Sequence, residues 1–193
     1  MTTTTNTATP DYIVDGVLTD GEPWVAIQSH VLSADATGVT FQSSTGANDW
    51  SQYMDLIIVG YCQSNTETSV ISRFNNDTGT NYTFQECYAD GASVAGYTAD
   101  TAYNSWGYCT RVSDGANEFS MFKVHILDIN SGKHTTSISH SATDKSGSGY
   151  VRFTVSRWNS QAAVTEIDLL AWTGDWKDGS RFDLWGVLPR MVS

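Results

Sequence analysis

Residues 164–188 read VTEIDLLAWTGDWKDGSRFDLWGVL, and this stretch decides the fold. It contains two segments in which apolar and polar residues alternate, separated by the polar segment TGDWKDGS. Ile167 and Leu169 share one face of the first segment, and Phe182 and Leu184 share one face of the second. A period of two with one apolar side is typical of half-buried strands, and the Gly and Asp residues between them favour a turn. The stretch therefore predicts an antiparallel hairpin that closes a β-domain.

The rest of the chain also favours strands. Residues 53–61, YMDLIIVGY, are apolar on both faces and predict a central strand, whereas the Ser/Thr-rich residues 134–140 predict an edge strand. Residues 89–117 are the least regular part, and we expect one or two short strands there, near residues 106–112. Further strands are predicted at residues 24–32, 39–42, 70–74, 82–88, 119–129 and 151–155. With no amphipathic helix of three turns, the sequence predicts an all-β protein: an antiparallel β-sandwich of jelly-roll type with nine or ten strands.

Length and composition limit the classes of protein that this chain can belong to. Its 193 residues, 40% of them hydrophobic, are enough for one sizeable domain with a real core. The formal net charge of −11 repels phosphate backbones, so we expect no nucleic-acid partner. No apolar run approaches the roughly 18 residues of a membrane-spanning helix. The opening MTTTTNTATP also lacks the pattern of a signal peptide. We therefore expect a soluble protein with no membrane partner.

Residues 1–22 differ from the rest and are predicted to form an extended N-terminal arm before a β-sandwich domain at residues 23–193. A Thr/Asn-rich start is followed by apolar residues set between acidic ones. These apolar residues, the candidates for partner binding, are Tyr12, Ile13, Val14, Val17 and Leu18. Such a short segment cannot build its own core, and ordering it costs roughly 1–2 kcal/mol of backbone entropy per residue. It is therefore either a frayed tail or an arm that docks on a sister subunit or another protein.

Residue patterns that carry chemistry are scarce. The three cysteines show no CxxC spacing, which favours reduced thiols over a zinc site. There is no HExxH, no GxSxG and no phosphate-binding glycine loop. Glu166 and Asp168 share a strand face, where solvation explains them more simply than catalysis does. Asp175, Asp178 and Asp183 fit either a calcium site or ordinary turn chemistry. We expect no enzyme activity and no cofactor.

Two stretches carry a family resemblance. The closing segment resembles the closing hairpin of a β-sandwich domain, and Phe74–Tyr82, with its sequence FNNDTGTNY, resembles a hairpin signature of the same domain. The Asn, Asp and Gly residues of FNNDTGTNY favour a turn. That domain recurs in virion surface proteins of tailed bacteriophages, both capsid cement proteins and the distal domains of tail fibres and tailspikes. The resemblance covers residues 53–187. It departs from the family at Trp185-Gly186, where Tyr-Gly is expected.

The resemblance implies a structural virion protein. Only about 50 residues precede the similar region, too few for a fibre shaft, which favours a capsid cement (decoration) protein that reinforces the shell. Such a protein is expected to be a homotrimer bound to the major capsid protein on the outer capsid surface, assembled in the cytoplasm of the host bacterium. Besides the arm, the outward apolar residues of the strand predicted at residues 119–129 are candidates for the contacts between subunits or with the capsid. They are Phe119, Met121 and Leu127.

The alternative is a receptor- or glycan-binding tip of a tail fibre or tailspike. Exposed aromatic rings stack on sugars, and a host surface glycan is the expected ligand in this case. The candidates for glycan or subunit contact are Trp106, Trp172, Trp176 and Trp185. An enzyme that degrades polysaccharide is a third interpretation, which the lack of converging acidic or histidine residues makes the weakest.

Overall fold

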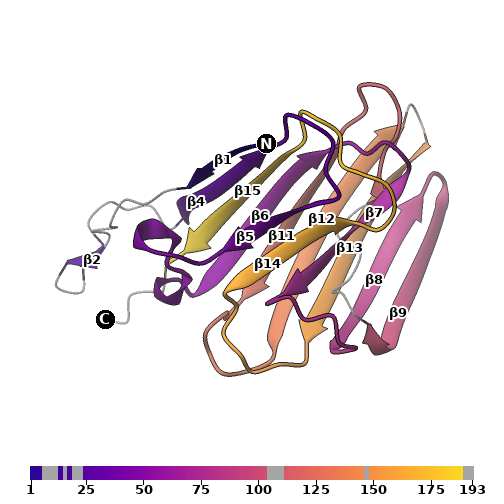
Figure 1. Ribbon diagram of the computed structural model, residues 1–193. Coiled ribbons are helices and arrows are strands. Elements are labelled where there is room, and N and C mark those ends of the chain that lie inside the picture. Colours follow the sequence, from indigo (N-terminus) through magenta and orange to yellow (C-terminus); the bar gives the residue numbers. More distant parts are fainter. Residues whose placement is uncertain (6–12, 15–16, 19–23, 104–110, 146–147, 189–193) are drawn as a thin grey trace.

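A computed structural model describes residues 1–5, 13–14, 17–18, 24–103, 111–145 and 148–188 of the chain (Figure 1). Within these residues the protein is all-β, as predicted, with two antiparallel sheets packed face to face as a sandwich. The only helical segments there are two 3₁₀ turns, η1 (Gly46–Asn48) and η2 (Trp50–Gln52), and no helix is long and apolar enough to cross a membrane. The described residues form fifteen strands, more than the nine or ten predicted.

The large sheet has nine strands and the small sheet has four. In spatial order the large sheet contains β1 (Thr2–Thr5), β4 (Trp24–Val31), β15 (Arg181–Val187), β6 (Asp55–Cys62), β11 (Ser120–Leu127), β12 (Thr135–Lys145), β13 (Ser148–Trp158), β8 (Tyr82–Asp90) and β9 (Ser93–Tyr103). The small sheet contains β10 (Arg111–Val112), β7 (Thr68–Phe74), β14 (Glu166–Ala171) and β5 (Gly38–Gln42). A separate two-stranded ladder joins β2 (Ile13–Val14) to β3 (Val17–Leu18).

The hydrophobic core fills the space between the two sheets. Ile167 and Leu169 of β14 point into it from the small sheet, and Phe182 and Leu184 of β15 point into it from the large sheet. The predicted inward faces of both segments are therefore confirmed. Burying each of these side chains contributes on the order of 1.5–3 kcal/mol to folding.

The predicted closing hairpin is wrong, because β14 and β15 belong to different sheets. The segment between them crosses from the small sheet to the large one, with Trp176 buried at its centre. The Trp176 amide donates a hydrogen bond to the Ala36 carbonyl at 2.8 Å, and its carbonyl accepts one from the Ala36 amide at 3.0 Å. Alternation predicts a strand with a buried side, but it is the same whether the next strand lies beside that strand or across the core.

The motif at Phe74–Tyr82 makes a second crossing between the sheets, from β7 to β8, instead of a hairpin within one sheet. Asn75 and Asn76 adopt left-handed φ values of 50° and 55°, which asparagine tolerates. Asp77 then accepts hydrogen bonds from the Trp158 indole at 2.7 Å and from the Asn81 amide at 2.9 Å. The predicted turn is confirmed, but it bends the chain across the core.

Strand β12 is not the edge strand predicted from its Ser/Thr content, because it lies between β11 and β13 in the large sheet. Its inward side chains are small and hydroxylated, and all are buried. They are Thr135, Ser137, Ser139, Ser141 and Thr143. Small side chains at these positions fit within the densely packed interior between the two sheets. Polarity alone therefore gave the wrong position in the sheet.

The irregular region contains a long strand that the sequence did not predict. Strand β9 (Ser93–Tyr103) pairs with β8 over eight residue pairs and forms the end of the large sheet. Residues 93–98 are all exposed, so no apolar face marks the strand in the sequence. The short strand expected near residues 106–112 corresponds to β10.

The start of the predicted arm joins the protein's own sheet. Thr2–Thr5 pairs antiparallel with β4, from Thr2 opposite Val31 to Thr5 opposite Gln28, and so forms the other end of the large sheet. These four residues thus find their partner within the chain. That the segment of residues 1–22 as a whole acts as an arm stays a prediction.

Candidate interaction surface

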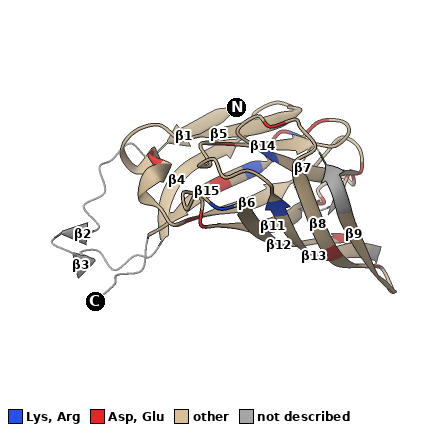
Figure 2. Cartoon of the chain, turned by 90° about the horizontal axis from the view of Figure 1, so that it is seen from below, with Lys and Arg blue, Asp and Glu red and all other residues tan. Residues whose placement is uncertain are grey.

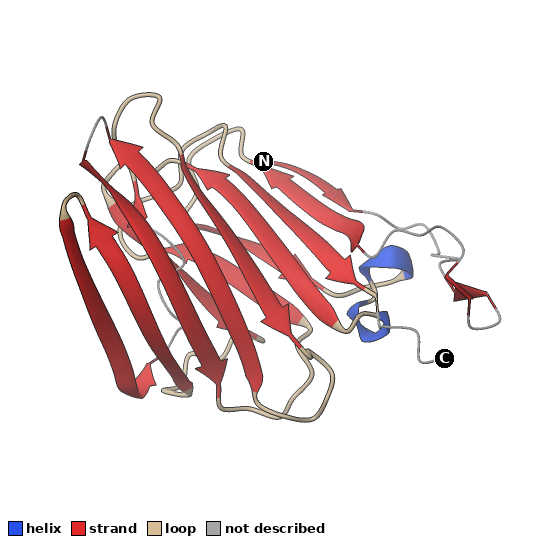
Figure 3. Cartoon of the chain, turned by 180° about the vertical axis from the view of Figure 1, so that it is seen from behind, coloured by secondary structure: helices blue, strands red, loops and turns tan. Residues whose placement is uncertain are grey.

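The outward face of the large sheet is the most distinctive surface of the described protein. The small sheet packs on the inner face, and no described element lies over the outer one (Figure 3). On β13 the outward residues are Val151, Phe153 and Val155, with exposed fractions of 63%, 41% and 37%. The residues between them, Arg152 and Thr154, are buried. The alternation predicted for this strand is present, but its apolar side faces outward.

A continuous row of apolar side chains crosses this face from β6 to β9. Strand register places the members directly opposite one another, strand by strand. In spatial order they are Tyr61, Met121, Ala142, Val151, Ala89 and Val94. Met121 is 52% exposed and Val94 is 83% exposed. A patch of contiguous exposed apolar residues on a soluble protein marks an interaction site far more often than scattered single residues do.

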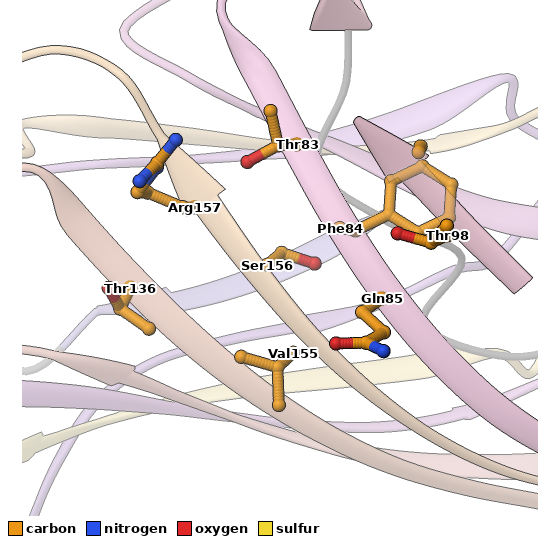
Figure 4. Close-up of a pocket in the computed structure, with 9 residues that line it drawn as sticks. Thr83, Phe84, Gln85, Thr98, Thr136, Val155, Ser156 and Arg157 are labelled. Carbon is orange, nitrogen blue, oxygen red and sulfur yellow. The ribbon is translucent and has the colours of Figure 1, made fainter. Parts of the chain in front are cut away.

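Two grooves lie on this face. One, of about 480 Å³, is lined by Met121, Lys123, Ile138 and His140 among others. The other, of about 460 Å³, is shown in Figure 4, where Thr83, Gln85, Val155 and Arg157 border it. The apolar row and Phe153 thus lie among polar and basic side chains, the arrangement of a protein interface with an apolar centre and a polar rim.

This face differs from the rest of the molecule in its distribution of acidic residues. Asp and Glu make up 21 of the 193 residues, and Figure 2 shows them in several of the loops that join the strands. Yet no carboxylate occupies an outward position in the middle of four strands of this face. These positions run from Thr136 to Ala142 on β12, from Val151 to Arg157 on β13, from Thr83 to Ala89 on β8 and from Val94 to Thr98 on β9. Asp144, the nearest on β12, lies beyond the apolar row.

The inner side of β13 explains its orientation. Arg152 Nε lies 3.6 Å from the Glu86 carboxylate of β8, and both side chains are buried. The guanidinium also lies 5.4 Å and 5.5 Å from the ring centres of Tyr88 and Tyr150. Burial raises the pKa of Glu86, while the charge of Arg152 acts to lower it. Turning β13 over would separate this pair, so the ion pair and rings fix Phe153 on the outer face.

The predicted contact residues on β11 do lie on this face. Met121 belongs to the apolar row, and Leu127 is half-buried on the same side of the strand. Phe119, just before β11, is half-buried and stacks on Tyr61 with ring centres 4.8 Å apart. Sequence reasoning missed Val151 and Phe153, because an apolar side opposite Thr and Ser normally faces the core.

The predicted tryptophans are spread over the molecule. Trp172 is 52% exposed at the end of β14, on the small sheet, and Trp185 is half-buried on the outer side of β15. Trp176 as a glycan or subunit contact is wrong: it is completely buried and packs on Phe182 with ring centres 5.5 Å apart. Trp106 lies outside the described residues. The four tryptophans therefore do not define one surface.

The predicted arm contacts are described only in part. Ile13 pairs with Leu18 and Val14 with Val17 in the β2–β3 ladder, and Tyr12 lies outside the described residues.

Three of the carboxylates singled out in the sequence accept hydrogen bonds from neighbouring side chains. Asp168 accepts a hydrogen bond from the Thr40 hydroxyl at 2.6 Å, and Glu166 accepts one from Gln42. Asp183 accepts one from Ser29 at 2.6 Å. Across the described ranges, no three His, Cys, Asp or Glu side chains gather in a way that would hold a metal ion.

No protein-family model matches this chain, and no curated protein matches it.

Proposed function

We propose that this chain is a structural protein that works by assembling with other protein surfaces, and that it is not an enzyme. The observation that carries the proposal is the exposed apolar outer face of the large sheet. Val151, Phe153 and Val155 lie there in open contact with water, although Arg152 occupies a buried position next to them. A binding surface accounts for this arrangement, which a monomer would have no reason to keep.

Within that class we propose a capsid cement protein of a tailed bacteriophage. Two features support it: the resemblance of residues 53–187 to virion surface domains, and the β-sandwich itself. We further propose that the sandwich is of jelly-roll type, because β7 to β8 and β14 to β15 each cross between antiparallel sheets.

The partners proposed are sister subunits, in a homotrimer, and the major capsid protein on the outer surface of the shell. The strongly negative net charge of −11 suits a protein that stays soluble until it meets its binding site. In this proposal residues 1–22 contribute contacts outside the chain's own sandwich, beyond the four residues that pair with β4.

A second candidate is a glycan-binding tip, favoured by one observation. A groove of about 340 Å³ on the outer face is lined by Trp185 together with Thr4, Ser29 and Asp183. An aromatic ring beside hydroxyl and carboxylate groups is a common arrangement for stacking and hydrogen bonding a sugar.

The test is quantitative mass spectrometry of virions purified from the phage that encodes this chain, with the major capsid protein as the internal standard. A cement protein is expected at a copy number comparable with that of the shell protein. A tail tip is expected at a few copies per particle, and absence from particles would overturn both virion proposals. Binding on a glycan array that is lost in Trp185→Ala and kept in Trp172→Ala would favour the tip.

A further inference from the structure

We propose that the outer face of the large sheet packs against a second copy of this chain. The apolar face is formed by outward side chains of β11, β12, β13, β8 and β9. Its members are Met121, Ile138, Ala142, Val151, Phe153, Val155, Cys87, Ala89 and Val94. The inference rests on the proposed assembly function and names the surface by which copies meet.

The first argument is the composition of the two sides of β13. In a monomer, the hydrophobic effect would place Val151 and Phe153 toward the core and Arg152 toward water. The structure has the opposite arrangement, with Arg152 in a buried ion pair with Glu86. The apolar side is therefore buried only if another surface covers it.

The second argument is size. Five strands about 4.8 Å apart, each with three outward residues about 6.8 Å apart, make a face on the order of 20 Å by 20 Å. Protein interfaces of standard size bury about 800 Å² of accessible surface per partner. Side chains standing out of the sheet give this face more accessible surface than its flat outline, and Lys123, Gln85, Thr136 and Arg157 extend it as a polar rim. It is large enough to be the centre of a stable contact.

The third argument concerns which protein binds to this face. Copies of a chain with a net charge of −11 repel one another, so they associate best through a region without carboxylates. The apolar face is such a region, and its rim carries the basic side chains Lys123 and Arg157, which attract a chain rich in carboxylates. Packing another surface over a sheet face, about 10 Å away, buries the side chains of that face efficiently, so this face suits a contact with a sister copy.

Cys87 provides a built-in reporter within the face. It is exposed, and strand register places it directly opposite Phe153 on one side and Gly96 on the other. A second copy over the face covers this thiol. Dissociation uncovers it.

The experiment compares the wild type with Phe153→Asp, Val151→Asp and the control Trp172→Asp. The control replaces an equally accessible apolar side chain on the other sheet, 52% exposed, so all three variants add one charge at a surface position. Sedimentation velocity at micromolar concentration gives the assembly state. Thiol labelling, followed at the Cys87 peptide by mass spectrometry, gives the accessibility of the face, and circular dichroism verifies the β-fold of each variant.

We expect the wild type and Trp172→Asp to sediment as multimers, and Phe153→Asp and Val151→Asp to sediment as monomers with an unchanged spectrum. Cys87 should label roughly tenfold or more slowly in the multimers, and faster on dilution, because only the dissociated chain exposes it. A monomeric wild type overturns the inference. So does a multimer that persists in both face variants with Cys87 fully reactive, which would place the contact elsewhere.

The outcome is separable from the proposed function. If the wild type is a monomer in solution but is found on capsids in high copy number, the inference about the face and the homotrimer both fail, and the proposed cement role on the capsid stands. If the face assembles as described but the chain is absent from virions, the inference stands and the cement proposal fails.

Discussion

The crossing between β14 and β15 gives a sharp prediction about two buried tryptophans. Trp176 and Trp50 are both almost fully buried, at 0% and 1% exposed. The Trp50 indole donates a hydrogen bond to the Asn48 side-chain oxygen at 3.0 Å. The Trp176 indole nitrogen has no hydrogen-bond partner among the described residues. Replacing each tryptophan by phenylalanine therefore removes the same atoms but breaks a hydrogen bond only at Trp50.

The expected difference follows from this asymmetry. Both substitutions lose similar packing, which cancels in the comparison. Trp50→Phe also leaves the buried Asn48 oxygen without its indole donor, at a cost of about 1–3 kcal/mol. Trp176→Phe instead removes a desolvated N–H group and relieves a penalty of about 1–3 kcal/mol. We therefore expect Trp50→Phe to lower the free energy of unfolding by about 2 kcal/mol or more beyond the effect of Trp176→Phe.

The assay is equilibrium unfolding in urea, followed by circular dichroism and extrapolated linearly to water. Both substitutions are made in the Phe153→Asp background, so that dissociation of subunits does not contribute. Trp176→Ala, which empties the centre of the crossing, serves as a reference and should cost about 3–5 kcal/mol. If Trp176→Phe destabilises the protein as much as Trp50→Phe does, the indole of Trp176 is hydrogen-bonded and the reasoning is refuted.

Three further predictions concern the same framework. Gly60→Val should destabilise the fold by about 1–3 kcal/mol in urea unfolding, because a Cβ there would overlap the Phe122 ring; unchanged stability would contradict the packing. Burial acts to raise the pKa of Asp77, but hydrogen bonds, first that of Trp158, hold it below its ordinary value. The stability it confers is thus present above about pH 4 and lost as the pH falls further, so Asp77→Asn should flatten the acid limb of the thermal midpoint plotted against pH. Truncation after Gly174 removes β15 from between β4 and β6, and no soluble folded protein should be recovered on expression; a monomer with a native spectrum would refute this.

The sequence predicted much of the fold because period-two patterns report directly on burial. The inward faces of β14, β15 and β11 were all placed correctly, and residues 53–61 were placed as an interior strand. The pattern does not report which sheet a strand joins. The two crossings were therefore interpreted as hairpins, although the nine residues between Ala171 and Arg181 are more than a tight hairpin needs.

The outer face was harder to predict, because it breaks the usual rule for burial. On β13 the alternation is clear, but only the partner of Arg152 shows which side is inside, and Glu86 lies 66 positions away in the sequence. Met121 was identified from its own strand, whereas Tyr61 and Val94 join it only through the register of the intervening strands. Trp176 was taken as exposed because it lies in a polar turn, and long-range pairing with Ala36 buries it.

The mass of the native protein in solution tests the central claim, that copies of this chain assemble through the outer face of the large sheet. Sedimentation equilibrium of the wild type at micromolar concentration should give a multiple of the 21.1 kDa chain, and Phe153→Asp under the same conditions should give 21.1 kDa. A wild type that remains at 21.1 kDa throughout that concentration range would contradict the account.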